Sequence, residues 1–141
     1  MKVQFSIAGN PQGKARPRFS HGHAYTPDAT RQYETMTAFL YRRAANGYFF
    51  SQKTPLSVTI LVYFAVPKNA SKKKKEVMLH GGAFPVRKPD ADNIAKIILD
   101  ALNGTAYHDD AQIVQLSVRK QYAEKNSVEV ILEDICQREK S

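Results

Sequence analysis

With 141 residues, of which 43% are hydrophobic, the chain has the length of one domain and the composition of an ordinary packed core. These values exclude a disordered chain, and one cysteine excludes an internal disulfide, so we expect a single domain over residues 1–141 in a reducing cytoplasm. The longest apolar runs are far too short to span a bilayer.

The net charge of +8 is concentrated in the first half of the chain. Residues 1–66 carry eight Lys and Arg against two acidic residues, whereas the rest of the chain carries thirteen against eleven. Such a field favours polyphosphate partners, nucleic acid first and an anionic membrane surface second. Many basic proteins bind no nucleic acid, so charge alone leaves the partner open.

The first half of the chain predicts a strand, a loop, a helix and a second strand. The first strand is expected at the alternating residues Val3, Phe5 and Ile7. Residues 9–18 predict a basic loop, and Thr26-Pro27 predicts a helix N-cap followed by proline in the first turn. The buried face of that helix should hold Tyr33, Met36, Leu40 and Ala44. Residues 56–66 are β-rich and apolar at both parities, which predicts a strand in the middle of the sheet.

In the second half, a basic connection at residues 68–75 leads to a second amphipathic helix that ends near Asn103-Gly104. Its apolar face is expected at Ile94, Ile98, Ala101 and Leu102. Alternating residues at 114–118 and 128–132 predict a closing hairpin. The resulting order, β-α-β-α-β-β, predicts an α/β (α+β) domain with helices packed against one mixed β-sheet.

Five aspartates and no glutamate lie between residues 90 and 110: Asp90, Asp92, Asp100, Asp109 and Asp110. Pro89 places Asp90 at the mouth of the second helix and Asp92 in its first turn, where two carboxylates can point the same way. Lys96 follows one turn later, and Asp109-Asp110 precede the next strand. Carboxylates with a lysine alongside suit a hard divalent cation and metal-assisted phosphodiester hydrolysis.

A structural interpretation of the same residues is also open. Asp90 would then cap the helix, Asp92 would favour the helix dipole, and Lys96 would be the i+4 ion-pair partner of Asp92. The pair at residues 109 and 110 would only shape a turn.

The blocks Lys88-Pro-Asp-Ala-Asp-Asn-Ile-Ala-Lys96, Asp100-Ala-Leu-Asn-Gly104 and Asp109-Asp-Ala-Gln-Ile113 resemble the signature of the RusA family of Holliday-junction resolvases. The basic loop Gly13-Lys-Ala-Arg-Pro-Arg18 resembles that family's amino-terminal pattern. The resemblance spans roughly residues 3 to 120. The chain departs from it at Tyr107, where a tryptophan often precedes the acidic pair.

The resemblance implies a crossover junction endodeoxyribonuclease that resolves four-way junctions by paired nicks in DNA recombination and repair. It implies that Asp90, Asp92 and Asp110 hold Mg²⁺, with Mn²⁺ as a substitute, that Asp109 is a weaker ligand, and that Lys96 assists catalysis. It further implies a homodimer, no membrane partner and a bacterial or phage origin, with many relatives in prophages. The rival interpretation is a DNA-binding accessory protein, or a resolvase relative without activity, whose acidic cluster is structural.

Cations outside the acidic cluster are the candidates for DNA contact: Lys14, Arg16, Arg18, Lys72, Lys73, Lys74, Lys75 and Lys88. The lysine run at 72–75 is otherwise a solvated segment. Aromatic residues are candidates for base stacking or for core burial: Tyr25, Tyr41, Tyr48, Phe49 and Phe50. We expect the dimer interface to draw on Tyr48, Phe49, Phe50 and Phe84, and we expect Cys136 to be inert.

Overall fold

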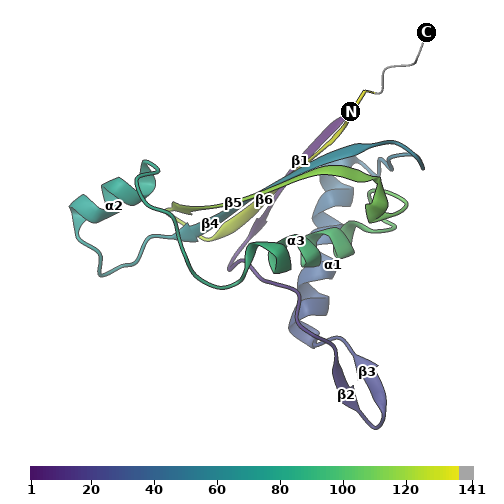
Figure 1. Cartoon of the computed structure of the whole chain (residues 1–141), viewed down its shortest axis with the longest axis horizontal. Helices are drawn as coiled ribbons and strands as arrows, with labels where there is room; N and C mark the ends of the chain where they lie inside the picture. The colour runs from purple at the N-terminus through teal and green to yellow at the C-terminus, as the bar shows by residue number, and fades with distance from the viewer. Residues whose placement is uncertain (137–141) are drawn as a thin grey trace.

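A four-stranded mixed sheet forms the centre of the protein in the computed structural model, which describes residues 1–136 (Figure 1). The strands are β1 (Lys2–Ala8), β4 (Leu56–Ala65), β5 (Ile113–Ala123) and β6 (Ser127–Asp134), in the order β1-β6-β4-β5. β6 is antiparallel to β1 and β4, whereas β4 and β5 are parallel. The expected α+β domain with a mixed sheet is confirmed, and β4 lies in its interior as predicted.

Two helices, α1 (Asp28–Ala45) and α3 (Ala91–Leu102), pack together against one face of this sheet (Figure 1). Strand side chains buried on that face alternate with more exposed ones, as the period of a pleated strand requires. α3 contributes the apolar stripe that its sequence predicts, and Ile94, Ile97, Ile98 and Leu102 are fully buried. The helix layer therefore fixes α3, and with it the acidic residues of its first turn, against the sheet.

The predicted hairpin of β5 and β6 is wrong, because β4 lies between these two strands. The short connection at residues 124–126 spans the end of β4, and Asn126 lies there with its Oδ1 accepting a hydrogen bond from the backbone N–H of Ala65 at 2.7 Å. Alternation predicted the strands but not which neighbours they pair with, since it reports only which face is buried.

α1 begins one residue later than expected and buries a different face. Pro27, rather than Thr26, occupies the N-cap position, without a side-chain cap. The buried residues are Thr30, Tyr33, Thr37 and Tyr41, so of the expected face only Tyr33 is buried; Met36 and Ala44 are exposed. Thr37 is accommodated because its hydroxyl donates to the Tyr33 carbonyl at 2.8 Å, which satisfies the buried polar group.

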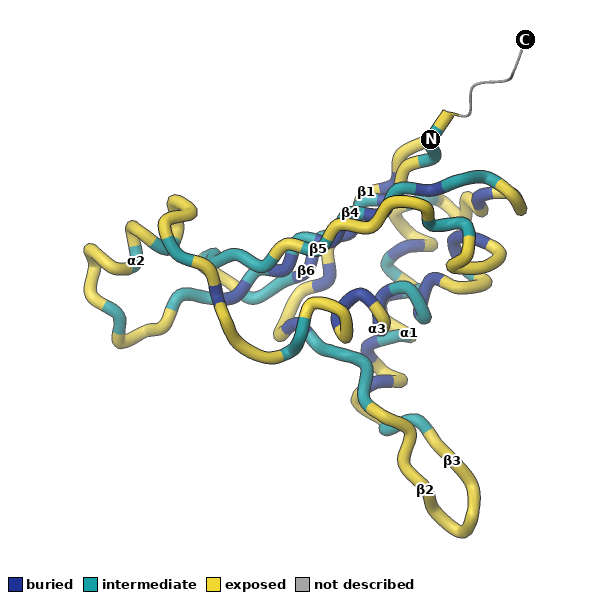
Figure 2. Tube along the Cα trace, viewed as in Figure 1, coloured by how far each residue is buried: buried dark blue, intermediate teal, exposed yellow. Residues whose placement is uncertain are grey.

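Two elements outside the expected order project from the body (Figure 2). A small hairpin of β2 (Arg18–Ser20) and β3 (His23–Tyr25) precedes α1 at the bottom of the view, and α2 (Lys72–Leu79) stands apart from it at the left (Figure 1). The lysine run at 72–75 is therefore helical rather than part of an irregular connection, with Ser71 as N-cap accepting from the Lys74 N–H. Serine is a favoured N-cap residue, so Ser71 is the feature of the sequence that indicates a helix beginning at Lys72.

Several aromatic residues proposed for interfaces belong to the core instead. Phe50 and Tyr41 are fully buried, so both are unsuited to base stacking and Phe50 is excluded from a dimer interface. Tyr48, Phe49, Phe84 and Tyr25 remain exposed. No helix within residues 1–136 is long and apolar enough to cross a bilayer.

Candidate active site

The amino end of α3 carries the first two aspartates in the positions that the sequence predicts. Asp90 is the N-cap residue with extended backbone, and Asp92 lies in the first turn. The Asp90 carboxylate does not cap the helix; it accepts from Lys88 Nζ at 2.7 Å. That hydrogen bond and the nearby charges of Lys88 and Lys120 hold the pKa of Asp90 below its ordinary value. The purely structural interpretation of Asp90 as a cap is therefore wrong.

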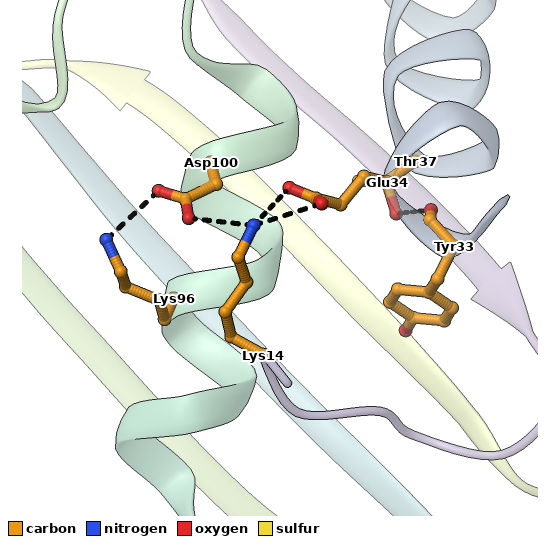
Figure 3. Close-up of polar contacts among 6 residues, drawn as sticks. All are labelled: Lys14, Tyr33, Glu34, Thr37, Lys96 and Asp100. Atoms are coloured by element: carbon orange, nitrogen blue, oxygen red, sulfur yellow. Dashed lines mark hydrogen bonds and ion pairs between the residues drawn. The ribbon is translucent and has the colours of Figure 1, made fainter. Parts of the chain in front are cut away.

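Lys14 ties the amino-terminal loop to both helices (Figure 3). Its Nζ lies 3.0 and 3.1 Å from the two carboxylate oxygens of Glu34 on α1, and 3.2 Å from Asp100 Oδ2 on α3. Burial alone would lower the pKa of Lys14, but hydrogen bonds to Glu34 and Asp100 outweigh it and raise the pKa. The ammonium is thus charged and held by two carboxylates of its own chain.

Lys96 pairs with Asp100 at 3.4 Å, one turn further along α3, and not with Asp92 (Figure 3). The i+4 pair with Asp92 that the structural interpretation required is absent from the ion pairs of residues 1–136. Lys96 keeps 61% of its side chain exposed. Its ammonium is therefore open to an anion that approaches α3 from solvent.

A groove of about 590 Å³ lies between the basic loop and α3. Residues 14–17 form one wall, and Asp92, Asn93, Lys96 and Asp100 form the other. The loop is seated by a backbone hydrogen bond from Lys14 N–H to Asn93 O at 3.0 Å. Gly13 favours this approach, because a Cβ there would lie only 3.0 Å from the Cβ atoms of Asn93 and Pro89 and would push the loop away from α3. Arg16, Asp92 and Lys96 line the same groove.

The acidic pair Asp109-Asp110 is held by Gln112, whose role the sequence analysis missed. Gln112 Oε1 accepts from the backbone N–H groups of His108 and Asp109 at 2.8 and 3.1 Å. Its Nε2 donates to the carbonyls of Ser51 and Thr54 at 3.0 and 3.1 Å. Asp110 opens a 3₁₀ turn, Asp110–Gln112, that leads directly into β5. One amide thereby fixes the acidic pair to the loop before β4.

Charge is crowded around this pair. A hydrogen bond with the Asp109 carboxyl, followed by burial and the negative charges of Asp109 and Asp100, raises the pKa of Asp110, while Lys96 opposes the rise. The same three carboxylates add to burial in raising the pKa of Tyr107. Tyr107 is fully buried and donates to the Leu99 carbonyl at 2.7 Å, so it fixes the loop to α3. Asp100, Asp109, Asp110 and Lys96 thus form one electrostatic neighbourhood.

The predicted ligands are only partly brought together. Asp92 lines the groove, Asp110 lies near Asp100 and Lys96, and Asp90 is turned to Lys88. Among residues 1–136, no group of three or more acidic, His or Cys side chains is close enough to hold a metal ion. Three further charged residues lie around the predicted ones, and the sequence predicts no role for them there: Asp100, Glu34 and Lys120.

Comparison with known proteins decides the family. The sequence matches the family model described as Endodeoxyribonuclease RusA over residues 8–133. The protein belongs to the RusA endodeoxyribonuclease family. It is also similar to the uncharacterized protein YqaN of Bacillus subtilis (strain 168), with 35% identity over 144 residues that cover 94% of this chain and 96% of the relative.

The residues present have the donor chemistry that the divalent cation implied by RusA membership needs. Carboxylate oxygens are the donors that Mg²⁺ prefers, and few protein ligands suffice because the ion keeps several waters. A hydrogen bond with Asp109, burial and the charges of Asp109 and Asp100 raise the pKa of Asp110, so negative charge is crowded at the acidic pair. A cation held there would relieve that crowding, but binding requires the carboxylates of residues 1–136 to lie closer together than they do here.

Proposed function

We propose that the protein is a metal-dependent endodeoxyribonuclease that nicks branched DNA at four-way junctions, acting in recombination and repair. The observation that carries the proposal is the groove in which a basic loop faces the carboxylates and lysine of α3. A phosphodiester needs both signs of charge at one place: cations to hold the backbone, and carboxylates to hold the metal.

In this proposal Asp90, Asp92 and Asp110 hold the metal, with Asp109 as the weaker ligand. When bound, Mg²⁺ would activate water and neutralise charge on the phosphate, and Mn²⁺ would substitute. Lys96 donates to a non-bridging phosphate oxygen and stabilises the charge that grows there. Lys88 contacts only Oδ1 of Asp90, so the Oδ2 atom is the one that would face a metal ion.

DNA contact is assigned to cations on three elements. Arg16 lies on the loop that lines the groove, and Arg18 is the first residue of β2, which follows that loop. Lys88 lies beside the start of α3, and the lysines at 72–75 stand on α2. Lys14 contributes differently, because its ammonium is taken up by Glu34 and Asp100. Its part is to hold the loop in place, and phosphate contact falls mainly to the arginines.

We further propose a homodimer with two-fold symmetry. Resolution of a junction requires nicks in two opposed strands, and a two-fold dimer presents two copies of the site related by one axis. Exposed apolar side chains on the edge strand β5, Val114 and Leu116, and in the loop before α3, Phe84 and Val86, are the surfaces such a contact would cover. Sedimentation at micromolar concentration measures the mass, and a stable monomer making paired symmetric nicks would contradict the dimer.

The decisive experiment compares a synthetic four-way junction with linear duplex of the same sequence, with Mg²⁺ and with EDTA. The wild type should nick the junction only with metal, and Asp92→Asn should bind it without nicking. Lys96→Ala should slow nicking by orders of magnitude while costing no more than roughly 0.5 kcal/mol of stability, because the side chain is exposed. Binding without nicking by the wild type would favour the rival, an accessory DNA-binding protein.

A further inference from the structure

The hairpin of β2 and β3 is built from residues that the fold itself does not use. All six strand residues are exposed, and Phe19 is 78% exposed, more than any other aromatic side chain in residues 1–136. The hairpin stands clear of both helices and the sheet (Figure 2). Its loop residues His21 and Gly22 both have positive φ, 52° and 79°, as a tight two-residue hairpin turn requires. The chain thus forms a defined turn to present side chains, and not to bury them.

The pairing register sorts those side chains onto two faces. Arg18 lies opposite Tyr25 and Ser20 lies opposite His23, which places a cation, an aromatic ring and polar groups on one face. Phe19 lies opposite Ala24 on the other face. Because Ala24 is small, it leaves the Phe19 ring uncovered. One face can contact a nucleic-acid backbone while the other offers a flat apolar ring.

The hairpin is joined directly to the groove. Arg18 follows Lys14 by only four positions in the chain, and Lys14 is fixed to α3 by its backbone and by its ammonium. The chain between them spans no more than about 14 Å. Residues 13–25 carry three Lys and Arg and no acidic residue, so a polyanion is the favoured occupant. DNA held at the groove therefore passes within reach of Phe19.

We propose that the β2–β3 hairpin binds unstacked nucleobases at the branch point of the DNA substrate, with Phe19 stacking on a base and Arg18 on the adjoining backbone. The proposal rests on the proposed function and deepens it. Stacking is tolerant of sequence because every base has a π-face, and at an opened branch the bases lack a stacked neighbour. The hairpin would then select branched over linear DNA, a choice that phosphate contacts alone cannot make.

The test uses a junction that carries 2-aminopurine at the branch point, whose fluorescence rises when the base leaves the stack. Wild-type protein should raise the fluorescence, and Phe19→Ala should abolish the rise and weaken binding of a short single strand about tenfold. Phe19→Trp, which keeps a π-face, should retain the single-strand affinity, whereas Phe19→Leu, which keeps apolar bulk without a π-face, should lose both effects. Phe39→Ala is the matched control, because Phe39 is a half-exposed phenylalanine on the outer face of α1.

Failure of this inference is separable from failure of the proposed function. Neither the fluorescence nor the single-strand binding measurement depends on cleavage. A wild-type protein that unstacks the branch-point base but nicks no DNA would therefore contradict the nuclease proposal and still support base stacking by the hairpin. The inference is overturned if Phe19→Ala matches the wild type in both measurements, or if Phe19→Leu does. It is also overturned if Phe19→Ala changes the sedimenting mass, since the ring would then contact a second copy of the chain.

Discussion

Replacing Lys14 with methionine removes one charge and leaves most of the side-chain volume in place. In the wild type its Nζ makes three contacts of 3.0 to 3.2 Å with Glu34 and Asp100, and the three side chains are 19–24% exposed. Breaking a fully buried ion pair costs about 3–5 kcal/mol, and breaking a surface pair costs about 0–1 kcal/mol. The intermediate burial places Lys14→Met at roughly 1–3 kcal/mol. At about 3 °C per kcal/mol for a chain of this size, the melting temperature should fall by roughly 3–9 °C.

Activity should fall further than stability. Without the ammonium, the loop keeps only its backbone bond to Asn93, and Asp100 is left with Lys96 as its partner. Lys96 is then held more strongly and is less available to a phosphate. Melting temperature and single-turnover nicking rate, measured on the same preparations, report the two effects separately.

The matched control is Lys2→Met, which removes an exposed lysine from the start of β1. Adding Glu34→Gln to Lys14→Met should recover part of the lost stability, because the Glu34 carboxylate, which has lost its Lys14 partner, is replaced by a neutral amide. A melting temperature for Lys14→Met within about 1 °C of wild type would refute the reasoning, since the ion pairs would then contribute nothing measurable.

Three further changes test other parts of the structure. Asp110→Asn should abolish nicking yet raise metal-free stability by no more than about 1 kcal/mol, because ionised Asp110 is repelled by Asp109 in the fold. At low pH the Asp110 carboxyl is neutral, so the variant gains no stability over the wild type. The gain appears as the pH rises through the raised pKa of Asp110 and the wild-type carboxyl ionises; melting temperatures measured in EDTA across this pH range report it. Neutral replacement of residues 72–75 should weaken junction and duplex binding alike and flatten the salt dependence of affinity; an unchanged slope would remove α2 from the DNA contact. Gln112→Ala should cost about 1 kcal/mol by chemical denaturation, because it removes four hydrogen bonds whose backbone partners are exposed or half-buried and can bind water instead.

Local patterns in the sequence were sufficient for α3 and its first turn. Pro89 and the apolar spacing of Ile94, Ile98 and Leu102 determine where the helix begins and which face it buries, so Asp90 and Asp92 fall where they were expected. The family could be predicted from the sequence because the acidic part of its signature lies within one continuous stretch of chain, residues 88–113.

Contacts between distant segments could not be predicted in this way. Lys14 meets Glu34 across 20 positions of the chain and Asp100 across more than eighty, and nothing local to any of them marks the others as partners. The place of β4 between β5 and β6 is likewise a property of the sheet, and alternation within a strand is silent about it. The β2–β3 hairpin did leave a local signal, Gly22 between two short runs that contain Phe19 and Tyr25.

The parallel pairing of β4 and β5 determines at what stage of folding the proposed site residues reach their places. All the carboxylates assigned to the site lie in the long connection between these two strands, at residues 66–112. A parallel pair forms only after the whole connection has been closed, which makes its pairing a late and non-local step of folding. The segments that carry Asp90 and Asp110 therefore reach their places only once the sheet is complete. A partly folded chain would carry the same acidic residues and lysines without their folded arrangement, so under the proposed function nicking activity would be gained and lost cooperatively with the fold itself.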